Sequence, residues 1–246
     1  GTLTQNKMTV VEYSGGDEAL LATSLALCSD SELDENGQAG GDPTQAAVVN
    51  YANKVGLPKY DLTVKYPRVA EIPFDSGRKL MTTVHSKPES GYIQHTTGAP
   101  DVVINKCSSY LEDGKIQNMT EEKKNFFVAE NKRLADKALR VLAAGYREYE
   151  SLPAQITPDD ENNLVFLGLV GMIDPVREEV PVAIEHCRDA GIRPIMITGD
   201  HRDTATAIAL QLGIIHDRSQ AITGAMLDEI SEEDFIRDVE LYGVYA

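Results

Sequence analysis

Ile195-Met196-Ile197-Thr198-Gly199-Asp200 is the stretch that decides the predicted fold. Its apolar residues are typical of the end of a buried strand, and a helix is predicted just after it, from Asp203 to Leu212. In such a strand–turn–helix unit the glycine lets backbone amides approach a phosphate, the threonine adds a hydroxyl, and the helix N-terminus favours negative charge. The turn alone does not separate a phosphate site from an ordinary helix cap, because Gly and Asp are common in such turns.

The alternation of strands and helices continues on both sides of this turn. Strands are predicted at 164–173, 192–197, 221–223 and 243–246, and helices at 180–190, 203–212 and 231–240. We therefore predict a doubly wound α/β core with a parallel sheet, whose ligands lie beyond the carboxyl ends of its strands.

Between residues 11 and 163 the pattern is different. Helices are predicted at 17–29 and 43–55, strands at 68–72, 79–85 and 92–96, and one long helix at 120–144 that ends before Gly145. Separate runs of helices and strands indicate an α+β domain inserted into the α/β core. The polar loops 37–41 and 151–163 are expected to be exposed.

Composition limits the classes of function. The chain has 246 residues, of which 42% are hydrophobic and 25% charged, as in a globular protein with one large or two modest domains. The 23 basic and 39 acidic residues give a net charge of −16, which argues against nucleic acid or an anionic membrane as the main partner. Three widely spaced cysteines argue against a disulfide framework. The longest apolar run, 164–173, is too short to cross a bilayer.

Two segments far apart in the chain carry a family resemblance. Gly1-Thr2-Leu3-Thr4 and Thr198-Gly199-Asp200, in this order, resemble phosphate-handling segments of the P-type ATPases, ion pumps that phosphorylate themselves on an aspartate. The family's first segment reads Asp-Lys-Thr-Gly-Thr-Leu-Thr, so the resemblance puts the phosphorylated aspartate upstream of Gly1. It implies a haloacid-dehalogenase-like (Rossmann-like) core, truncated here, with Thr2, Thr198, Gly199 and Asp200 as its catalytic residues and Thr2 near Mg²⁺ (magnesium).

Further segments resemble the nucleotide-binding insert of type II pumps. These segments are Gly41-Asp42-Pro43-Thr44-Gln45, Phe74-Asp75-Ser76-Gly77-Arg78-Lys79-Leu80-Met81 (one position shorter than the family pattern), Thr97-Gly98-Ala99-Pro100-Asp101 and Ala138-Leu139-Arg140-Val141-Leu142. The resemblance implies that Phe74 stacks on adenine, that Lys79 lines the pocket and that Arg140 reaches the phosphates. The other implied nucleotide-binding residues are Asp42, Thr44, Gln45, Ser76, Thr97 and Gly98.

Each of these segments also has a purely structural interpretation. Asp42 can be a helix cap, Phe74 a core residue, and Arg140 an exposed charge on a helix. Two positions depart from the family, which usually has a lysine where Thr97 stands and an acid where Gln45 stands. Loss of a hydrogen-bonded cation costs on the order of 1.5 to 3 kcal/mol, so weak ATP binding is expected.

Asp174-Pro175-Val176-Arg177 marks the expected domain junction. Proline makes a stiff corner here whatever the function, and the segment resembles the hinge of the pumps, in which Asp174 and Arg177 are counted with the cofactor-binding residues and Asn6 lies on the outgoing strand. The resemblance implies a partial phosphorylation (P) domain at 1–10 and 168–246, and a nucleotide-binding (N) domain at 11–167.

Taken together, the resemblance implies an ATP-binding cytosolic fragment of a calcium-pump-like, cation-transporting P-type ATPase. The parent would lie in a membrane and couple ATP hydrolysis, with Mg²⁺, to ion transport through an aspartyl-phosphate, whereas this soluble piece, on the cytoplasmic side, would bind ATP and be inactive. Its partners would be the actuator and transmembrane domains.

Two alternatives stay open. One is a soluble haloacid-dehalogenase-superfamily phosphatase with a large cap domain, which accounts for the turn at Thr198 but not for the segments at Phe74 and Thr97. The other is a non-catalytic nucleotide-binding or interaction module. Recognition of adenine by the insert, as opposed to phosphate alone, separates them.

Overall fold

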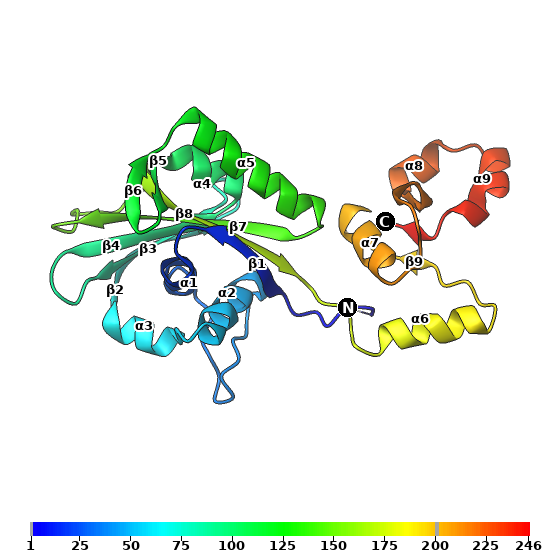
Figure 1. The fold of residues 1–246 in the computed structure, drawn as a ribbon, viewed down its shortest axis with the longest axis horizontal. Coiled ribbons are helices and arrows are strands. Elements are labelled where there is room, and N and C mark those ends of the chain that lie inside the picture. Colours follow the sequence, from blue (N-terminus) through cyan, green and yellow to red (C-terminus); the bar gives the residue numbers. More distant parts are fainter. Residues whose placement is uncertain (1, 200–201) are drawn as a thin grey trace. The chain divides into compact units, whose positions relative to one another are not determined.

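The computed structural model describes residues 2–199 and 202–246, which form two compact units (Figure 1). The large unit is Lys7–Ile173, and the small unit combines the segment up to Asn6 with Asp174–Ala246. This division differs from the predicted boundaries at 11 and 167. The reason is that strand β1 (Thr9–Gly15) pairs antiparallel with residues 168–173 of strand β8 (Leu164–Ile173), so both strands belong to the large unit.

The large unit contains an 8-stranded mixed sheet with the order β2-β3-β4-β7-β8-β5-β6, and β1 pairs with β8 outside this path. Its remaining strands are β2 (Arg68–Asp75), β3 (Leu80–Ser86), β4 (Tyr92–Gly98), β5 (Cys107–Glu112), β6 (Lys115–Asn118) and β7 (Arg140–Tyr149). All neighbours are antiparallel except β5 and β8. A mixed sheet with helices on both faces is the α+β architecture predicted for the insert.

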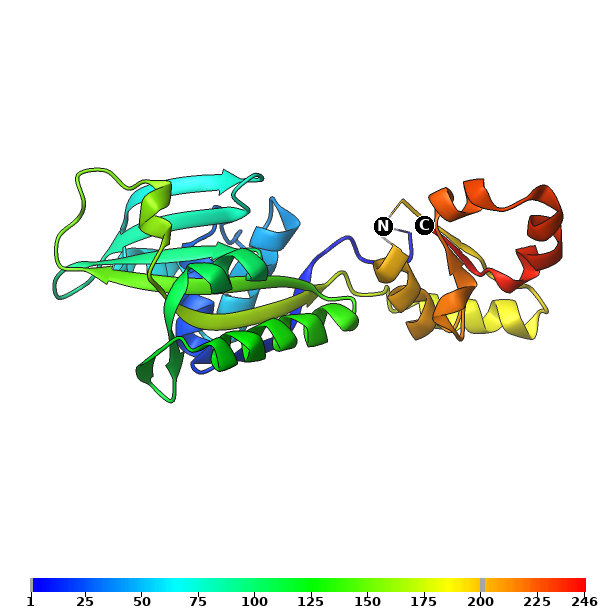
Figure 2. The same cartoon turned by 90° about the horizontal axis from the view of Figure 1, so that it is seen from above.

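Helices cover the two faces of this sheet, as Figures 1 and 2 show. One face packs against α1 (Glu18–Leu27), α2 (Pro43–Lys54) and α3 (Lys59–Lys65), and the other against α4 (Pro100–Lys106) and α5 (Glu121–Asp136). Strand β8 contributes Leu167 to the first core and Phe166 to the second. Burial on both faces explains why 164–173 is apolar throughout. Because strands of a parallel core are apolar for the same reason, the sequence placed this strand in the α/β core, which is wrong.

The predicted helix 120–144 is wrong after Asp136. Helix α5 ends at Asp136, Ala138 takes a positive φ of 56°, and the chain reverses into β7. The sequence after Ala138 has good helix propensity, but β7 forms hydrogen-bonded ladders with β4 on one side and β8 on the other, and this pairing overrides local preference. Arg140 therefore lies on a strand.

The small unit follows the predicted alternation of strands and helices. Its 3-stranded parallel sheet has the order β10-β11-β9, formed by Ala221–Ile222, Val244–Tyr245 and Met196–Ile197. Helices α6 (Val180–Asp189) and α7 (Arg202–Gln211) contribute to its core, and α8 (Gly224–Glu229) and α9 (Glu232–Asp238) lie between β10 and β11 in the chain. Short 3-10 helices occur at Pro158–Glu161, Arg218–Gln220 and Val239–Leu241. Among the described residues, no helix has the length and apolar character needed to cross a bilayer.

Candidate functional site

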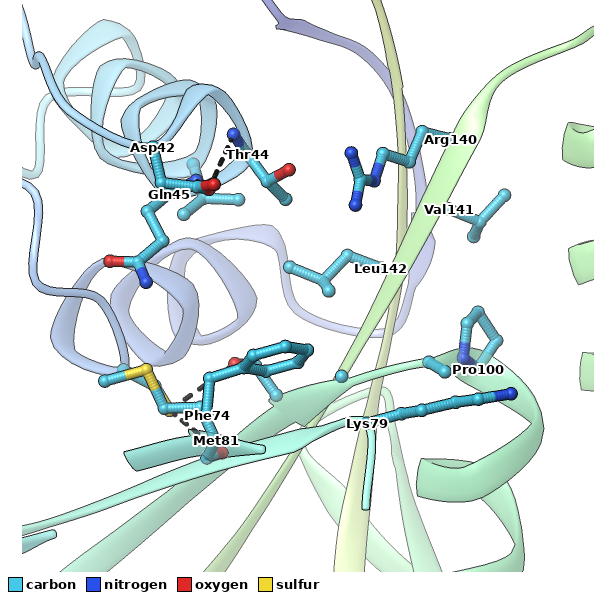
Figure 3. A pocket seen from close by; sticks show the side chains of 15 residues that line it. Asp42, Thr44, Gln45, Phe74, Lys79, Met81, Pro100, Arg140, Val141 and Leu142 are labelled. Carbon is cyan, nitrogen blue, oxygen red and sulfur yellow. Dashed lines mark hydrogen bonds between the residues drawn. The ribbon is translucent and has the colours of Figure 1, made fainter. Parts of the chain in front are cut away.

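A pocket of about 350 Å³ opens in the large unit, between the start of α2, the turn from β2 to β3, the junction of β4 with α4, and the start of β7 (Figure 3). Its volume is at the lower end of the range typical of small-molecule sites. The pocket brings together predicted residues from separate segments of the chain: Asp42, Thr44, Gln45, Phe74, Lys79, Thr97, Gly98 and Arg140. Ser76 is not part of this lining, and Asp174 and Arg177 lie in the small unit.

Phe74 is not a core residue, because its side chain is 59% exposed at the end of β2. It stands over Met81 at the edge of the pocket, on the same side of the cavity as the sheet (Figure 3). Val48 and Leu142 add apolar surface to the lining. An exposed aromatic ring beside apolar side chains provides a surface on which a flat ring can stack.

The turn that follows Phe74 is held by an ion pair between a partly buried arginine and a buried glutamate. Arg78 donates hydrogen bonds to Glu161 Oε1 at 2.6 Å and to the carbonyl oxygens of Pro73 and Leu80 at 2.7 and 3.2 Å. Glu161 is fully buried, although the sequence predicted an exposed loop at 151–163. No signal in the polar run around Glu161 indicates this role, since its partner lies 83 residues away in the chain.

Two cations reach the pocket at the far side from Gln45. In Figure 3 the guanidinium of Arg140 extends from β7 into the opening above Leu142, and Lys79 extends along Pro100. Neither side chain forms an ion pair within the described part of the chain. Cationic side chains without a carboxylate partner can bind phosphate oxygens with charge-assisted hydrogen bonds. In a chain with a net charge of −16, such local charge is needed to hold an anion.

Asp42 caps α2, as its structural interpretation predicted. Its Oδ1 accepts hydrogen bonds from the backbone N–H groups of Thr44 and Gln45, each at 3.0 Å. This cap fixes the first turn of α2, from which Thr44 and Gln45 contribute to the pocket. Asp42 thus positions its neighbours, and it also lines the pocket itself.

The floor of the pocket is neutral. Thr97 is 5% exposed and donates a hydrogen bond to Cys28 Sγ at 3.4 Å, and Cys28 donates to the Met81 carbonyl at 3.2 Å. Burial raises the pKa of the Cys28 thiol, which keeps it uncharged. Sequence reasoning missed Cys28, because an isolated apolar-face cysteine carries no signal for a pocket. Gly98 is required for another reason: a Cβ there would collide with the Lys79 carbonyl oxygen.

In the small unit the N-terminal segment lies against the predicted junction. Thr4 donates a hydrogen bond to Asp174 Oδ2 at 2.7 Å, Gln5 N–H to the Pro175 carbonyl at 3.0 Å, and Arg177 N–H to the Leu3 carbonyl at 3.0 Å. Two chain segments therefore run side by side at this point.

The predicted catalytic residues of the small unit lie at two places in the chain. Thr198 and Gly199 directly follow β9, and Thr2 precedes the paired segment. Asp200 lies outside the described residues. Within the described ranges, no group of three or more His, Cys, Asp or Glu side chains is placed to hold a metal ion.

Known proteins similar to this chain point to one family. The family described as P-type ATPase, cytoplasmic domain N, matches residues 18–179, which include the whole pocket lining. Calcium-transporting ATPase 1 of Lactococcus lactis is 43% identical over all of this chain, and a calcium-transporting ATPase of Listeria monocytogenes is 40% identical. The sodium/potassium-transporting ATPase subunit alpha-1 of Oreochromis mossambicus is 32% identical over 90% of the chain. The chain spans 29%, 30% and 26% of the lengths of these relatives.

Proposed function

We propose a function from one premise: the chain belongs to the P-type ATPases, whose cytoplasmic domain N it contains. On this premise the large unit is the nucleotide-binding domain and binds ATP in its pocket. The small unit contributes part of the phosphorylation domain, with a haloacid-dehalogenase-like core. Its parallel sheet, with Thr198 and Gly199 directly after β9, supports that assignment.

One observation carries the proposal for the pocket. An exposed aromatic ring, Phe74, and two cations without ion-pair partners among the described residues, Lys79 and Arg140, line the same cavity. Adenine stacks on Phe74 with Met81 and Leu142 as apolar neighbours, and the phosphates lie by Arg140 and Lys79. The neutral floor at Thr97 and Cys28 offers the phosphates no further charge, so ATP binds weakly, with a dissociation constant of roughly 1 mM.

The whole protein is proposed to be a cation pump. Relatives named calcium-transporting ATPases, at 40% to 43% identity, support calcium as its ion. In such a protein an aspartate takes the γ-phosphoryl group of ATP, which yields aspartyl-phosphate and ADP, and hydrolysis of that acyl phosphate releases phosphate. Thr2, Thr198, Gly199 and Asp200 would hold the transferred group, with Thr2 near Mg²⁺, and the segment from Asp174 to Arg177 would be the hinge. The actuator and transmembrane domains are the proposed partners.

An NMR titration tests the nucleotide site. The chain is titrated to 10 mM, roughly ten times the dissociation constant estimated above, with Mg-ATP or with inorganic phosphate and magnesium, while the amide signals of Phe74, Gly98 and Arg140 are followed. We expect ATP to shift these signals and phosphate to leave them in place. Phe74→Ala should weaken ATP binding roughly tenfold, since base stacking contributes about 1 to 3 kcal/mol. Phe126→Ala, which removes an aromatic ring 50% exposed on α5, is the matched control.

The opposite outcomes are equally clear. If ATP shifts none of these signals, or if Phe74→Ala binds ATP as tightly as Phe126→Ala does, the pocket is not the nucleotide site. If phosphate instead shifts only signals around Thr198, the phosphatase with a large cap domain becomes the better assignment.

A further inference from the structure

Gln45 presents a hydrogen-bond donor to the pocket. Its Oε1 accepts a hydrogen bond from the backbone N–H of Asp30 at 2.6 Å, and the Ser29 hydroxyl lies 3.4 Å from the same oxygen. A backbone N–H can only donate, so the end of the amide that meets it is the oxygen, and the usual ambiguity between the two ends of a glutamine is resolved. Within the described part of the chain Gln45 Nε2 has no partner. It is left to donate to a ligand.

The Gln45 amide is held in this orientation from both sides. The backbone N–H of Gln45 itself donates to Asp42 Oδ1, which fixes the start of α2. The segment that supplies the Asp30 N–H is anchored by two cations: Lys59 Nζ donates to the Ser29 carbonyl at 2.8 Å, and Arg68 Nη2 donates to the same carbonyl at 2.7 Å. Because both ends of the contact are fixed, turning the amide over would leave the Asp30 N–H facing another donor.

The two ends of the pocket differ in charge, and this difference indicates which part of a nucleotide would lie near Gln45 Nε2. Figure 3 shows Gln45 and Met81 on one side of the cavity and Arg140 and Lys79 on the other, with the Gln45 amide nitrogen turned toward Met81 and its oxygen turned away. With the phosphates of a nucleotide at the two cations, as proposed above, its purine would lie toward Gln45. The substituent at C6 of a purine projects from the edge remote from the ribose. In this orientation it is the group of the base that lies nearest to Gln45 Nε2.

We propose that Gln45 is a specificity-determining residue that favours a 6-oxopurine, so that the pocket binds ITP and GTP at least as tightly as ATP. The 6-oxo group of hypoxanthine or guanine accepts a hydrogen bond from Nε2, whereas the 6-amino group of adenine is itself a donor and faces a second donor. This inference rests on the proposed nucleotide site and adds to it a choice between bases.

The test compares ATP, GTP and ITP, each with magnesium, by competitive displacement from the full chain and its Gln45→Glu variant. In that variant one carboxylate oxygen still accepts from the Asp30 N–H, and the other presents an acceptor to the base. We expect the wild-type dissociation constant for ITP to equal or lie below that for ATP. Gln45→Glu should shift the ratio toward ATP roughly three- to tenfold, the effect of one hydrogen bond.

Two controls separate this effect from charge and folding. The added negative charge weakens all triphosphates alike, so the ratio of dissociation constants is the readout. Gln211→Glu makes the same change on the exposed surface of α7 and should leave the ratio unchanged. Matching amide spectra of the two variants outside the pocket exclude misfolding.

The outcomes distinguish the two proposals. If no nucleotide binds at millimolar concentration, the nucleotide site is wrong and the base preference is overturned with it. If ATP binds but ITP and GTP bind much more weakly, or if Gln45→Glu leaves the ratio as it is in wild type, ATP binding stands and the role of Gln45 is refuted.

Discussion

Glu161 shows how one residue can determine the geometry of a site it does not touch. It is fully buried, pairs with Arg78 at 2.6 Å and accepts a hydrogen bond from Thr82 at 2.8 Å. Removing one partner of a buried ion pair leaves an uncompensated charge, which costs about 3 to 5 kcal/mol. We expect Glu161→Ala to lower the free energy of unfolding by about 3 kcal/mol in urea denaturation. Glu150→Ala, at an exposed position, should change it by less than about 0.5 kcal/mol.

The same substitution should loosen the turn that carries Phe74 and Lys79, because Arg78 ties that turn to Glu161. ATP binding by Glu161→Ala, measured where the variant is still folded, should therefore weaken. A stability equal to that of the control variant would contradict the role assigned to this pair.

Two buried histidines predict how stability depends on pH. Burial lowers the pKa of His85 to about 4 and that of His95 to about 3, and the two rings lie 5.6 Å apart. Because the unfolded state binds these protons more readily, their contribution to stability is complete above about pH 6.5 and is lost as pH falls toward the folded-state pKa values. Together they lower the free energy of unfolding by up to about 2.7 kcal/mol per pH unit in that window.

Unfolding in urea at pH 7.0 and 5.5 measures this slope. His95→Gln removes one titrating group, so its free energy of unfolding should fall less between the two pH values than that of the wild type. If the free energy of unfolding falls equally in both proteins, His95 is not a buried, neutral side chain in solution.

The family resemblance grouped most residues of the candidate site, but it did not indicate which contacts hold them in place. The segments at Asp42, Phe74, Thr97 and Arg140 were grouped through their resemblance to the pumps, and their residues line one cavity. Glu161 could not be predicted, because its burial depends on a partner that is distant in the chain.

At the scale of elements, Gly168 lets β1 and β8 lie close together. Its φ is +151°, and a Cβ added there would collide with the Ser14 carbonyl oxygen and lie 2.9 Å from Gly15 Cα. Gly168→Ala therefore combines backbone strain with overpacking, and we expect it to lower the free energy of unfolding by about 2 to 4 kcal/mol. Thermal unfolding followed by circular dichroism measures this loss.

Gly224→Ala is the matched control for Gly168→Ala. A Cβ at Gly224 meets no atom within 4 Å, and its φ is not in the left-handed region. Its melting temperature should stay close to that of the wild type. If Gly168→Ala melts at the same temperature as Gly224→Ala, the backbones of β1 and β8 do not approach each other this closely.

Elements were predicted well where local pattern and tertiary context agree, and poorly where they do not. The hairpin of β3 and β4 and the helices α1 and α2 were predicted, since their caps and turns are local features. The start of β7 was predicted as helix because Ala, Leu and Arg favour helices, and only its pairing with β4 and β8 makes it a strand. This pairing is also what brings Arg140 to the pocket.

At the scale of the molecule, alternating patterns predicted an inserted domain, and the structure divides the chain in the same way but at different residues. The shift of the second boundary from 167 to 173 follows from β8, whose last residues pair with the start of β1. A strand that is buried on both faces has the same continuous apolar sequence in a parallel core and in the centre of a mixed sheet. The pattern of residues therefore could not assign β8 to its unit.

The division predicts that residues 7–173 fold without the rest of the chain. The large unit has a core on each face of its sheet, and every residue that lines the pocket lies within it. A domain with its own hydrophobic core is expected to fold alone. We expect the amide spectrum of a 7–173 fragment to overlay that of the full chain for residues of the two cores, and its dissociation constant for ATP to agree within roughly twofold. If the fragment folds but binds ATP tenfold more weakly, residues outside the large unit contribute to the nucleotide site, and Phe74, Lys79 and Arg140 do not suffice to define it.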